Sequence, residues 1–164
     1  MKNLILLCGK PGCGKTTLAK FIKAKYGAVH FSADDFMLKL FGEIEDRQVF
    51  EEKLRKCKEL IYEICDELAN KNDIVLDFGF WTKEERRYLV KRFPNFNVIF
   101  IYMKLNDDDI FERIEYRNKH LKDNEYYMDK QTYKILSSKF EEVDKSEGNV
   151  YFVEKDTKIE GLNR

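Results

Sequence analysis

Residues 9–16, Gly-Lys-Pro-Gly-Cys-Gly-Lys-Thr, constrain the fold of this chain more than any other segment. They match the spacing G-x-x-x-x-G-K-[ST] and stand between an apolar run of strand length, residues 4–8, and a helix-forming segment, residues 17–22. In that context the glycines let successive backbone N–H groups turn inward, and the helix N-terminus adds partial positive charge. The alternative is a glycine-rich turn with an exposed lysine, but packing gives no reason for this run of glycines followed by Lys-Thr. The segment therefore predicts a phosphate-binding loop.

The motif gives its side chains separate roles. Lys15 would reach the outer phosphates of a nucleotide, and the Thr16 hydroxyl would hold Mg²⁺. We therefore expect ATP and Mg²⁺ as cofactors. The predicted nucleotide-binding residues are Gly9, Lys10, Pro11, Gly12, Cys13, Gly14, Lys15, Thr16 and Thr17.

Length and charge limit the class of nucleotide-binding protein. The chain has 164 residues, the size of one domain, so residues 1–164 are expected to form a single unit. That length leaves no room for a second domain that ATP hydrolysis would move, which argues against a motor or remodelling protein. Thirty basic and thirty acidic side chains are interspersed. This balance argues against tight binding of long nucleic acid, although a short strand end could still enter a local basic cleft.

The N-terminus and the cysteines indicate the compartment. The apolar run before Gly9 is too short for a signal sequence or a membrane span. The four cysteines lack C-x-x-C spacing and a neighbouring histidine cluster, so neither a zinc site nor a disulfide framework is expected. The sequence therefore predicts a protein of the reducing cytoplasm without a membrane partner.

Expected strands and helices alternate along the chain. Apolar residues recur at spacings of four and three over residues 46–70, which predicts a long amphipathic helix. The alternation predicts an α/β fold with a five-stranded parallel sheet and helices on both faces. Ligands on such sheets bind beyond the carboxyl ends of the strands. The expected strands are residues 4–8, 28–32, 74–77, 97–103 and 150–153, and the expected helices are residues 15–26, 46–70, 83–92, 107–120 and 129–144.

Asp34 and Asp35 directly follow the second expected strand. A carboxylate there can face the terminal phosphate and an incoming hydroxyl, which it would orient and deprotonate. Aspartate is also a common N-cap, and either residue could cap a helix that starts near Phe36. Both roles can hold at once, so we expect Asp34 to be catalytic and Asp35 to lie beside the substrate.

Asp77 and Trp81 mark the end of the third expected strand. An acid after an apolar strand is typical of a Walker B element, which acts on Mg²⁺ directly or through water, although it could instead cap the next turn. The aromatic run at residues 78–81 is more often core than a ligand platform. Trp81, the only tryptophan, would nevertheless lie where it could stack a substrate ring.

Arg113 and Arg117 lie four residues apart on one face of an expected helix, just before a polar stretch. We expect a lid near residues 113–130, whose arginines would neutralise the charge that develops during phosphoryl transfer. The alternative is a solvated helix face with i,i+4 ion pairs, for which Asp109 and Arg113 have suitable spacing.

Taken together, these motifs resemble a family of small P-loop kinases. Their order is the phosphate loop, Asp-Asp after the second strand, Leu-Asp-Phe-Gly-Phe-Trp after the third, and then Arg-x-x-x-Arg-Asn. This order is similar to that of the 5′-kinase domain of polynucleotide kinase, of zeta-type toxins and of chloramphenicol phosphotransferase, and it runs from Leu4 to about Glu147. The resemblance implies a three-layer P-loop NTPase sandwich with adenylate-kinase-like topology.

The resemblance also implies roles for individual residues. By it, Asp34 is the base that activates an acceptor hydroxyl, and Arg113 and Arg117 are lid arginines. Residues 75–86 are similar to a version of the motif found in bacterial members, which implies that Arg86 faces the substrate.

One position departs from the polynucleotide kinases. They carry an arginine shortly after the aspartate pair, where it grips a phosphate of the acceptor. This chain has Met37 there. The departure favours a smaller or less charged alcohol as acceptor.

These expectations combine into one hypothesis and one alternative. The hypothesis is an ATP-dependent kinase that phosphorylates a hydroxyl of a small molecule, a nucleoside, or a nucleotide or oligonucleotide end, and that is a monomer or a homodimer. The alternative is a nucleotide-binding ATPase or switch protein without an acceptor. A threonine-bearing switch loop and a D-x-x-G element are not evident in the sequence, so the kinase ranks first.

Overall fold

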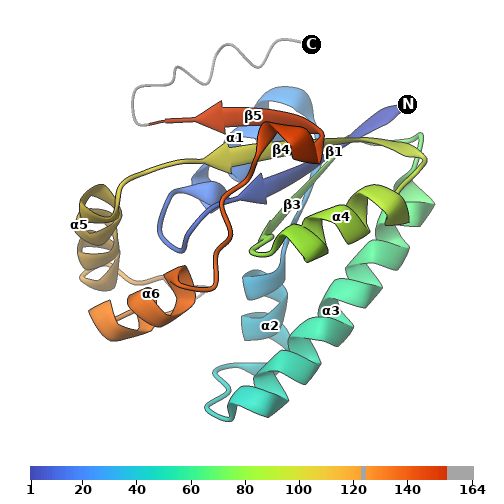
Figure 1. Ribbon diagram of the computed structural model, residues 1–164. Coiled ribbons are helices and arrows are strands. Elements are labelled where there is room, and N and C mark those ends of the chain that lie inside the picture. Colours follow the sequence, from blue (N-terminus) through green and yellow to red (C-terminus); the bar gives the residue numbers. More distant parts are fainter. Residues whose placement is uncertain (123–124, 155–164) are drawn as a thin grey trace.

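A parallel five-stranded sheet forms the centre of the molecule (Figure 1). The structure is a computed structural model that describes residues 1–122 and 125–154. The strand order is β2-β3-β1-β4-β5, and every neighbouring pair is parallel, which confirms the predicted sheet. The strands are β1 (Lys2–Cys8), β2 (Val29–Ser32), β3 (Ile74–Gly79), β4 (Phe96–Met103) and β5 (Asn149–Val153).

Helices connect the strands and cover the sheet. Within the described ranges, no helix is long and apolar enough to span a membrane. The helices are α1 (Lys15–Tyr26), α2 (Ala33–Phe41), α3 (Arg47–Leu68), α4 (Lys83–Arg92), α5 (Asp107–Asn118) and α6 (Lys130–Ser137), with a 3₁₀ turn, η1 (Lys145–Glu147), before β5.

β1 is the middle strand because its sequence is apolar on both faces. It pairs with β3 from Leu4 opposite Ile74, and with β4 from Lys2 opposite Phe96. A strand with neighbours on both edges and helices on both faces takes a near-continuous apolar sequence. The phosphate loop follows β1 directly, so it begins at the buried centre of the sheet.

Two apolar clusters cover the two faces of the sheet. One packs strand residues against α3 and α4, through side chains such as Ile61 and Leu89. The other packs them against α1 and α5, through side chains such as Leu18 and Ile114. The sheet therefore lies between two helical layers, as predicted, with α3 and α4 sharing one layer (Figure 1).

Most helices begin where the sequence provides a capping side chain. Each of these caps accepts a hydrogen bond from the backbone N–H three residues later, which satisfies one of the free donors of a helix N-terminus. The capping residues are Ser32, Asp46, Thr82, Asn106 and Asp129.

The predicted helix over residues 129–144 is wrong in its second half, because α6 ends at Ser137. The helical spacing of apolar residues continues through Phe140 and Val143, but these side chains are buried in the α3–α4 cluster instead. The backbone N–H of Glu141 donates to the carbonyl oxygen of Trp81 at 2.8 Å. Tertiary packing thus overrides the local periodicity and attaches this segment to the loop between β3 and α4.

Candidate active site

The phosphate loop joins the carboxyl end of β1 to α1, and its backbone requires glycine. Gly12 and Gly14 have φ angles of 79° and 101°, in the left-handed region that other residues rarely adopt. A Cβ at Gly12 would lie 2.7 Å from a side-chain carbon of Ile114. α1 follows Gly14 with no side-chain cap, so its first N–H groups lack a side-chain acceptor. Such a helix N-terminus is suited to binding phosphate.

The side chain of Lys15 folds back over the phosphate loop. Its Nζ donates hydrogen bonds to the carbonyl oxygens of Gly9 (2.9 Å) and Lys10 (2.8 Å) and lies 3.6 Å from Sγ of Cys13. The ammonium group therefore adds a positive charge beside the loop N–H groups, in the region predicted to bind the outer phosphates.

Thr16 and Asp77 form a candidate metal site. Thr16 Oγ1 donates to Asp77 Oδ2 at 2.6 Å, which connects the start of α1 to the end of β3. Mg²⁺ takes oxygen ligands of this kind and completes its coordination with nucleotide phosphates and water, so the two side chains fit this ion. Among the described residues, no group of three or more His, Cys, Asp and Glu side chains could hold a metal by itself. Phosphate oxygens of a nucleotide would therefore have to share the ion.

Asp34 and Asp35 lie in the first turn of α2, which begins at Ala33 and not near Phe36. The cap of this helix is Ser32, whose Oγ accepts from the N–H of Asp35 at 3.3 Å. The alternative in which an aspartate caps the helix is therefore wrong. The Asp34 carboxylate is left for another role.

The Asp34 carboxyl lies within electrostatic reach of the phosphate loop. The residue keeps solvent exposure, yet it lies among enough protein atoms that desolvation is the main cause of its raised pKa. The Asp77 carboxylate raises this pKa further, whereas Lys15 and Arg117 lower it. A carboxylate with a raised pKa is a stronger base, and the structure thus brings Asp34 together with three other predicted site residues.

α5 carries the two predicted lid arginines toward the loop. Arg113 Nη1 donates to the carbonyl oxygen of Cys13 at 3.2 Å. Arg117 exerts its charge on Asp34, and its buried Nε has no hydrogen-bond partner within residues 1–122 and 125–154. The lid role of the two arginines stays a prediction. Residues 123–124 of the predicted lid lie outside the described residues.

One polar contact that the sequence analysis missed connects the loop to α5 and α6. Lys10 Nζ lies 2.8 Å from Asp107 Oδ1, and the Tyr133 hydroxyl donates to the same oxygen at 2.7 Å. The hydrogen bond from Lys10 is the main cause of a lowered pKa at Asp107, and the bond from Tyr133 adds to it. Lys10 and Asp107 are 97 positions apart, and no sequence pattern relates them.

A pocket of about 500 Å³ opens beside the loop. Its lining includes Lys10, Tyr102, Asn106 and Asp107, so it lies near the carboxyl end of β4. In the strand order β4 and β3 flank β1 on opposite sides, which places this pocket across the loop from Asp77.

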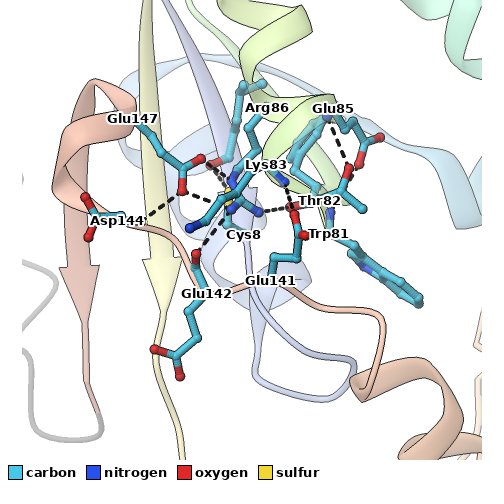
Figure 2. Close-up of polar contacts among 12 residues, drawn as sticks. Cys8, Trp81, Thr82, Lys83, Glu85, Arg86, Glu141, Glu142, Asp144 and Glu147 are labelled. Carbon is cyan, nitrogen blue, oxygen red and sulfur yellow. Dashed lines mark hydrogen bonds and ion pairs between the residues drawn. The ribbon is translucent and has the colours of Figure 1, made fainter.

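Arg86, predicted to face the substrate, is fully buried instead (Figure 2). Its Nε and Nη2 donate to the two carboxylate oxygens of Glu147 at 2.6 and 3.0 Å. Its Nη1 donates to the carbonyl oxygen of Phe80 at 2.9 Å, and Nη2 also reaches that of Glu142 at 3.3 Å. The structure therefore pairs Arg86 with Glu147 inside the protein, and its charge also acts on Cys8, the residue before the phosphate loop.

Trp81 lies in the loop between β3 and α4, half-buried against the α3–α4 cluster. In Figure 2 its indole points away from the Arg86–Glu147 pair. The backbone N–H of Trp81 donates to Glu85 Oε2 at 3.1 Å, which ties the β3–α4 loop to the first turn of α4. Its predicted stacking on a substrate ring, like the predicted substrate contact of Asp35, stays a prediction.

Comparison with known proteins identifies the family. The AAA_33 family, described as an AAA domain, matches residues 4–142. The chain belongs to this family. This AAA_33 chain is also 28% identical over 125 residues to an adenylate kinase from Mesomycoplasma hyopneumoniae (strain 7448). The match covers 69% of the chain and 57% of the adenylate kinase, so the AAA_33 chain spans little more than half the length of that relative.

Two solved structures share the fold of this AAA_33 chain. Kti12 from Chaetomium thermophilum, in complex with ADP-AlF3, has a TM-score of 0.73 and 17% identity, and the match covers 96% of this chain and 92% of Kti12. A chain of the Pnkp1/Rnl/Hen1 RNA repair complex has a TM-score of 0.67 and 21% identity, with 84% of this chain and 43% of that chain covered. These likenesses concern the fold. With the family match they confirm the P-loop α/β architecture and the resemblance to small P-loop kinases.

Proposed function

We propose that this protein is an ATP- and Mg²⁺-dependent kinase that transfers the γ-phosphoryl group to a hydroxyl of a small molecule, a nucleoside, or a nucleotide or oligonucleotide end. The observation that carries the proposal is the position of Asp34. It lies near Lys15 and Asp77, while Ser32 caps its helix. A carboxylate there would orient the hydroxyl of an acceptor and take its proton.

The donor nucleotide would lie along the phosphate loop. The loop N–H groups and Lys15 would bind the outer phosphates, and the nucleoside would extend into the pocket that Lys10 and Asn106 help to line. Thr16 and Asp77 would hold Mg²⁺, which when bound neutralises charge on the phosphate oxygens. Arg113 would keep the loop in position through the Cys13 carbonyl.

The transfer step needs one base and one leaving group. The acceptor oxygen forms a bond to the γ-phosphorus while the bond from that phosphorus to its bridging oxygen breaks, and ADP leaves with the electron pair. The proton of the acceptor hydroxyl moves to the Asp34 carboxylate. Arg113 and Arg117 would stabilise the charge that spreads over the transferring group.

Substitution of Asp34 tests the proposal. Asp34→Asn should abolish acceptor-dependent ADP production, by about 10²–10⁴-fold, and leave ATP binding unchanged, because the amide cannot accept the proton. Asp108→Asn, an exposed aspartate on α5, is the control. Full turnover by Asp34→Asn would show that the assignment is wrong. Slow hydrolysis that no alcohol stimulates would instead favour the switch alternative.

A further inference from the structure

The Tyr126 hydroxyl is a buried donor for which the described residues provide no acceptor. Tyr126 lies between α5 and α6, and its ring packs edge-on against Phe50 of α3 with centroids 6.4 Å apart. Its hydroxyl oxygen is buried and has no hydrogen-bond partner in the part of the chain that the structure describes. Buried hydroxyls are nearly always hydrogen-bonded, so this one indicates a bound group that is not part of the protein.

The neighbours of this hydroxyl place it at the acceptor side of the candidate active site. Burial raises the pKa of Tyr126 to about 12, and the carboxylates of Asp34 and Glu43 add to the shift. The phenol therefore stays protonated at neutral pH and can donate a hydrogen bond to a carboxylate or an alcohol oxygen. Arg117, whose buried Nε also lacks a partner among the described residues, faces the same carboxylate of Asp34.

Two carboxylates act on Tyr126, those of Asp34 and Glu43. Asp34 in turn lies within electrostatic reach of the carboxylates of Asp77 and Asp35 and of the cations Lys15 and Arg117. In the proposed function, the cations Lys15 and Arg117 would bind the donor phosphates.

Neither Arg47 nor Met37 supplies a free cation to this site. Arg47, whose guanidinium lies 6.0 Å from the ring of Phe50, is bonded to Glu51 at 2.6 Å. Met37, on the same helix as Asp34, is apolar and fully buried. An acceptor with its own phosphate or carboxylate would meet carboxylates there, and like charges at close range repel.

We propose that the Tyr126 hydroxyl binds the acceptor beside Asp34, and that the acceptor is a neutral or cationic alcohol with no phosphate or carboxylate near its reacting hydroxyl. This inference rests on the proposed kinase function. Tyr126 donates a hydrogen bond to an acceptor oxygen, and that bond holds the reacting hydroxyl toward Asp34. Glu43 disfavours anionic acceptors.

The charge of the acceptor can be tested without knowing its identity. A small-molecule extract is separated on an anion exchanger at pH 7, and each fraction is incubated with the protein and ATP labelled at the γ-phosphorus. We expect labelled product from the unretained fraction. Labelled product from the retained fraction alone would overturn the inference but leave the kinase function standing. Label in neither fraction, with ATP bound, would overturn the kinase function and this inference with it.

The role of Tyr126 is tested with the same unretained fraction as acceptor. Tyr126→Phe should raise the acceptor concentration needed for half-maximal labelling about tenfold and leave the KM for ATP unchanged. Tyr127→Phe is a matched control because that neighbouring tyrosine is 65% exposed. An acceptor dependence of Tyr126→Phe equal to the wild type would overturn the assignment.

A surface substitution keeps the inference testable if Tyr126→Phe folds poorly. Glu43 is exposed, so Glu43→Gln should fold normally, and Glu45→Gln, at an exposed residue two positions away, is its control. Glu43→Gln should raise labelling of the retained fraction relative to the unretained one by about threefold or more, because one repelling charge is gone. An unchanged ratio would contradict the proposed charge selection.

Discussion

The hydroxyl of Thr16 donates a 2.6 Å hydrogen bond to the carboxylate of Asp77, which lies 61 residues further along the chain. Thr16 is the last residue of the phosphate loop and Asp77 is near the end of β3, so the bond connects two adjacent strand ends of the sheet. Two oxygens held this close can share one small cation, and the Mg²⁺ dependence of nucleotide binding should therefore report on both side chains.

Removal of the Thr16 hydroxyl should weaken the metal site. We expect Thr16→Val to raise the Mg²⁺ concentration required for half-maximal ATP turnover by about tenfold or more, because one oxygen ligand is lost. Thr16→Ser keeps the oxygen and should behave like the wild type. A titration of turnover against Mg²⁺ measures the effect, and equal requirements for Val and Ser would exclude Thr16 as a ligand.

Loss of Arg113 should slow transfer more than it weakens nucleotide binding. Its guanidinium reaches the Cys13 carbonyl of the loop, where charge develops during the reaction. We expect Arg113→Ala to lower kcat about 10²-fold. Steady-state kinetics with varied ATP separates kcat from KM. Arg55→Ala, at an exposed arginine of α3 paired with Glu59, should leave both values unchanged.

The raised pKa of Asp34 should show in the pH dependence of kcat/KM, which reports the free enzyme. The base must be ionised, so activity should fall as the pH drops through a pKa above the ordinary aspartate value of about 3.9. The acidic limb of the pH–rate profile measures it. A limb that lies at or below the ordinary value would mean that another group limits the reaction.

Because its pKa is raised, the ionised Asp34 carboxylate should lower the free energy of unfolding at neutral pH. A carboxyl whose pKa is higher in the folded than in the unfolded state favours folding below its unfolded pKa, and this contribution is lost as the pH rises through the folded pKa. Asp34→Asn should therefore have a higher Tm than the wild type at pH 8, and the difference should shrink toward pH 5. Thermal unfolding of the variant and the wild type at pH 8 and pH 5 measures this difference in Tm. A lower Tm for the variant at pH 8 would contradict the expectation.

Arg86 should matter for stability and not for chemistry. Arg86→Met leaves the buried carboxylate of Glu147 without its partner and should lower the free energy of unfolding by about 3–5 kcal/mol. Arg87→Met, at the exposed neighbouring position, should change it by less than about 0.5 kcal/mol. Urea denaturation measures both. Adding Glu147→Leu to Arg86→Met should recover part of the loss, because no unpaired charge then remains.

The parts of the site that the sequence predicts are those encoded by local spacing. The phosphate loop, with Lys15 and Thr16, has its chemistry within eight residues, Gly9–Thr16, and its strand and helix are immediately adjacent. Asp77 was predictable because an acid that ends an apolar strand in a parallel sheet lies at the ligand-binding edge. Local pattern and topology agree at these positions.

The rest depends on contacts that no local pattern encodes. The sequence neighbours of Arg86, Arg87 among them, are typical of an exposed helix face. Its burial is explained only by its partner Glu147, 61 residues later. The helical spacing of Phe140 and Val143 predicted a helix, but those side chains instead fill the apolar layer beside α4. No sequence pattern singles out Tyr126, because its proposed role rests on a buried hydroxyl that has no partner among residues 1–122 and 125–154.

The Arg86–Glu147 pair also sets an order of events during synthesis. A ribosome releases the chain from its N-terminus, so α4 is complete well before Glu147 emerges. Until then the Arg86 guanidinium has no carboxylate partner. Burying it unpaired would carry a large desolvation cost. α4 can therefore dock fully only when the turn before β5 has been made, and the last strand of the sheet secures a helix that was translated 55 residues earlier (Arg92 to Glu147).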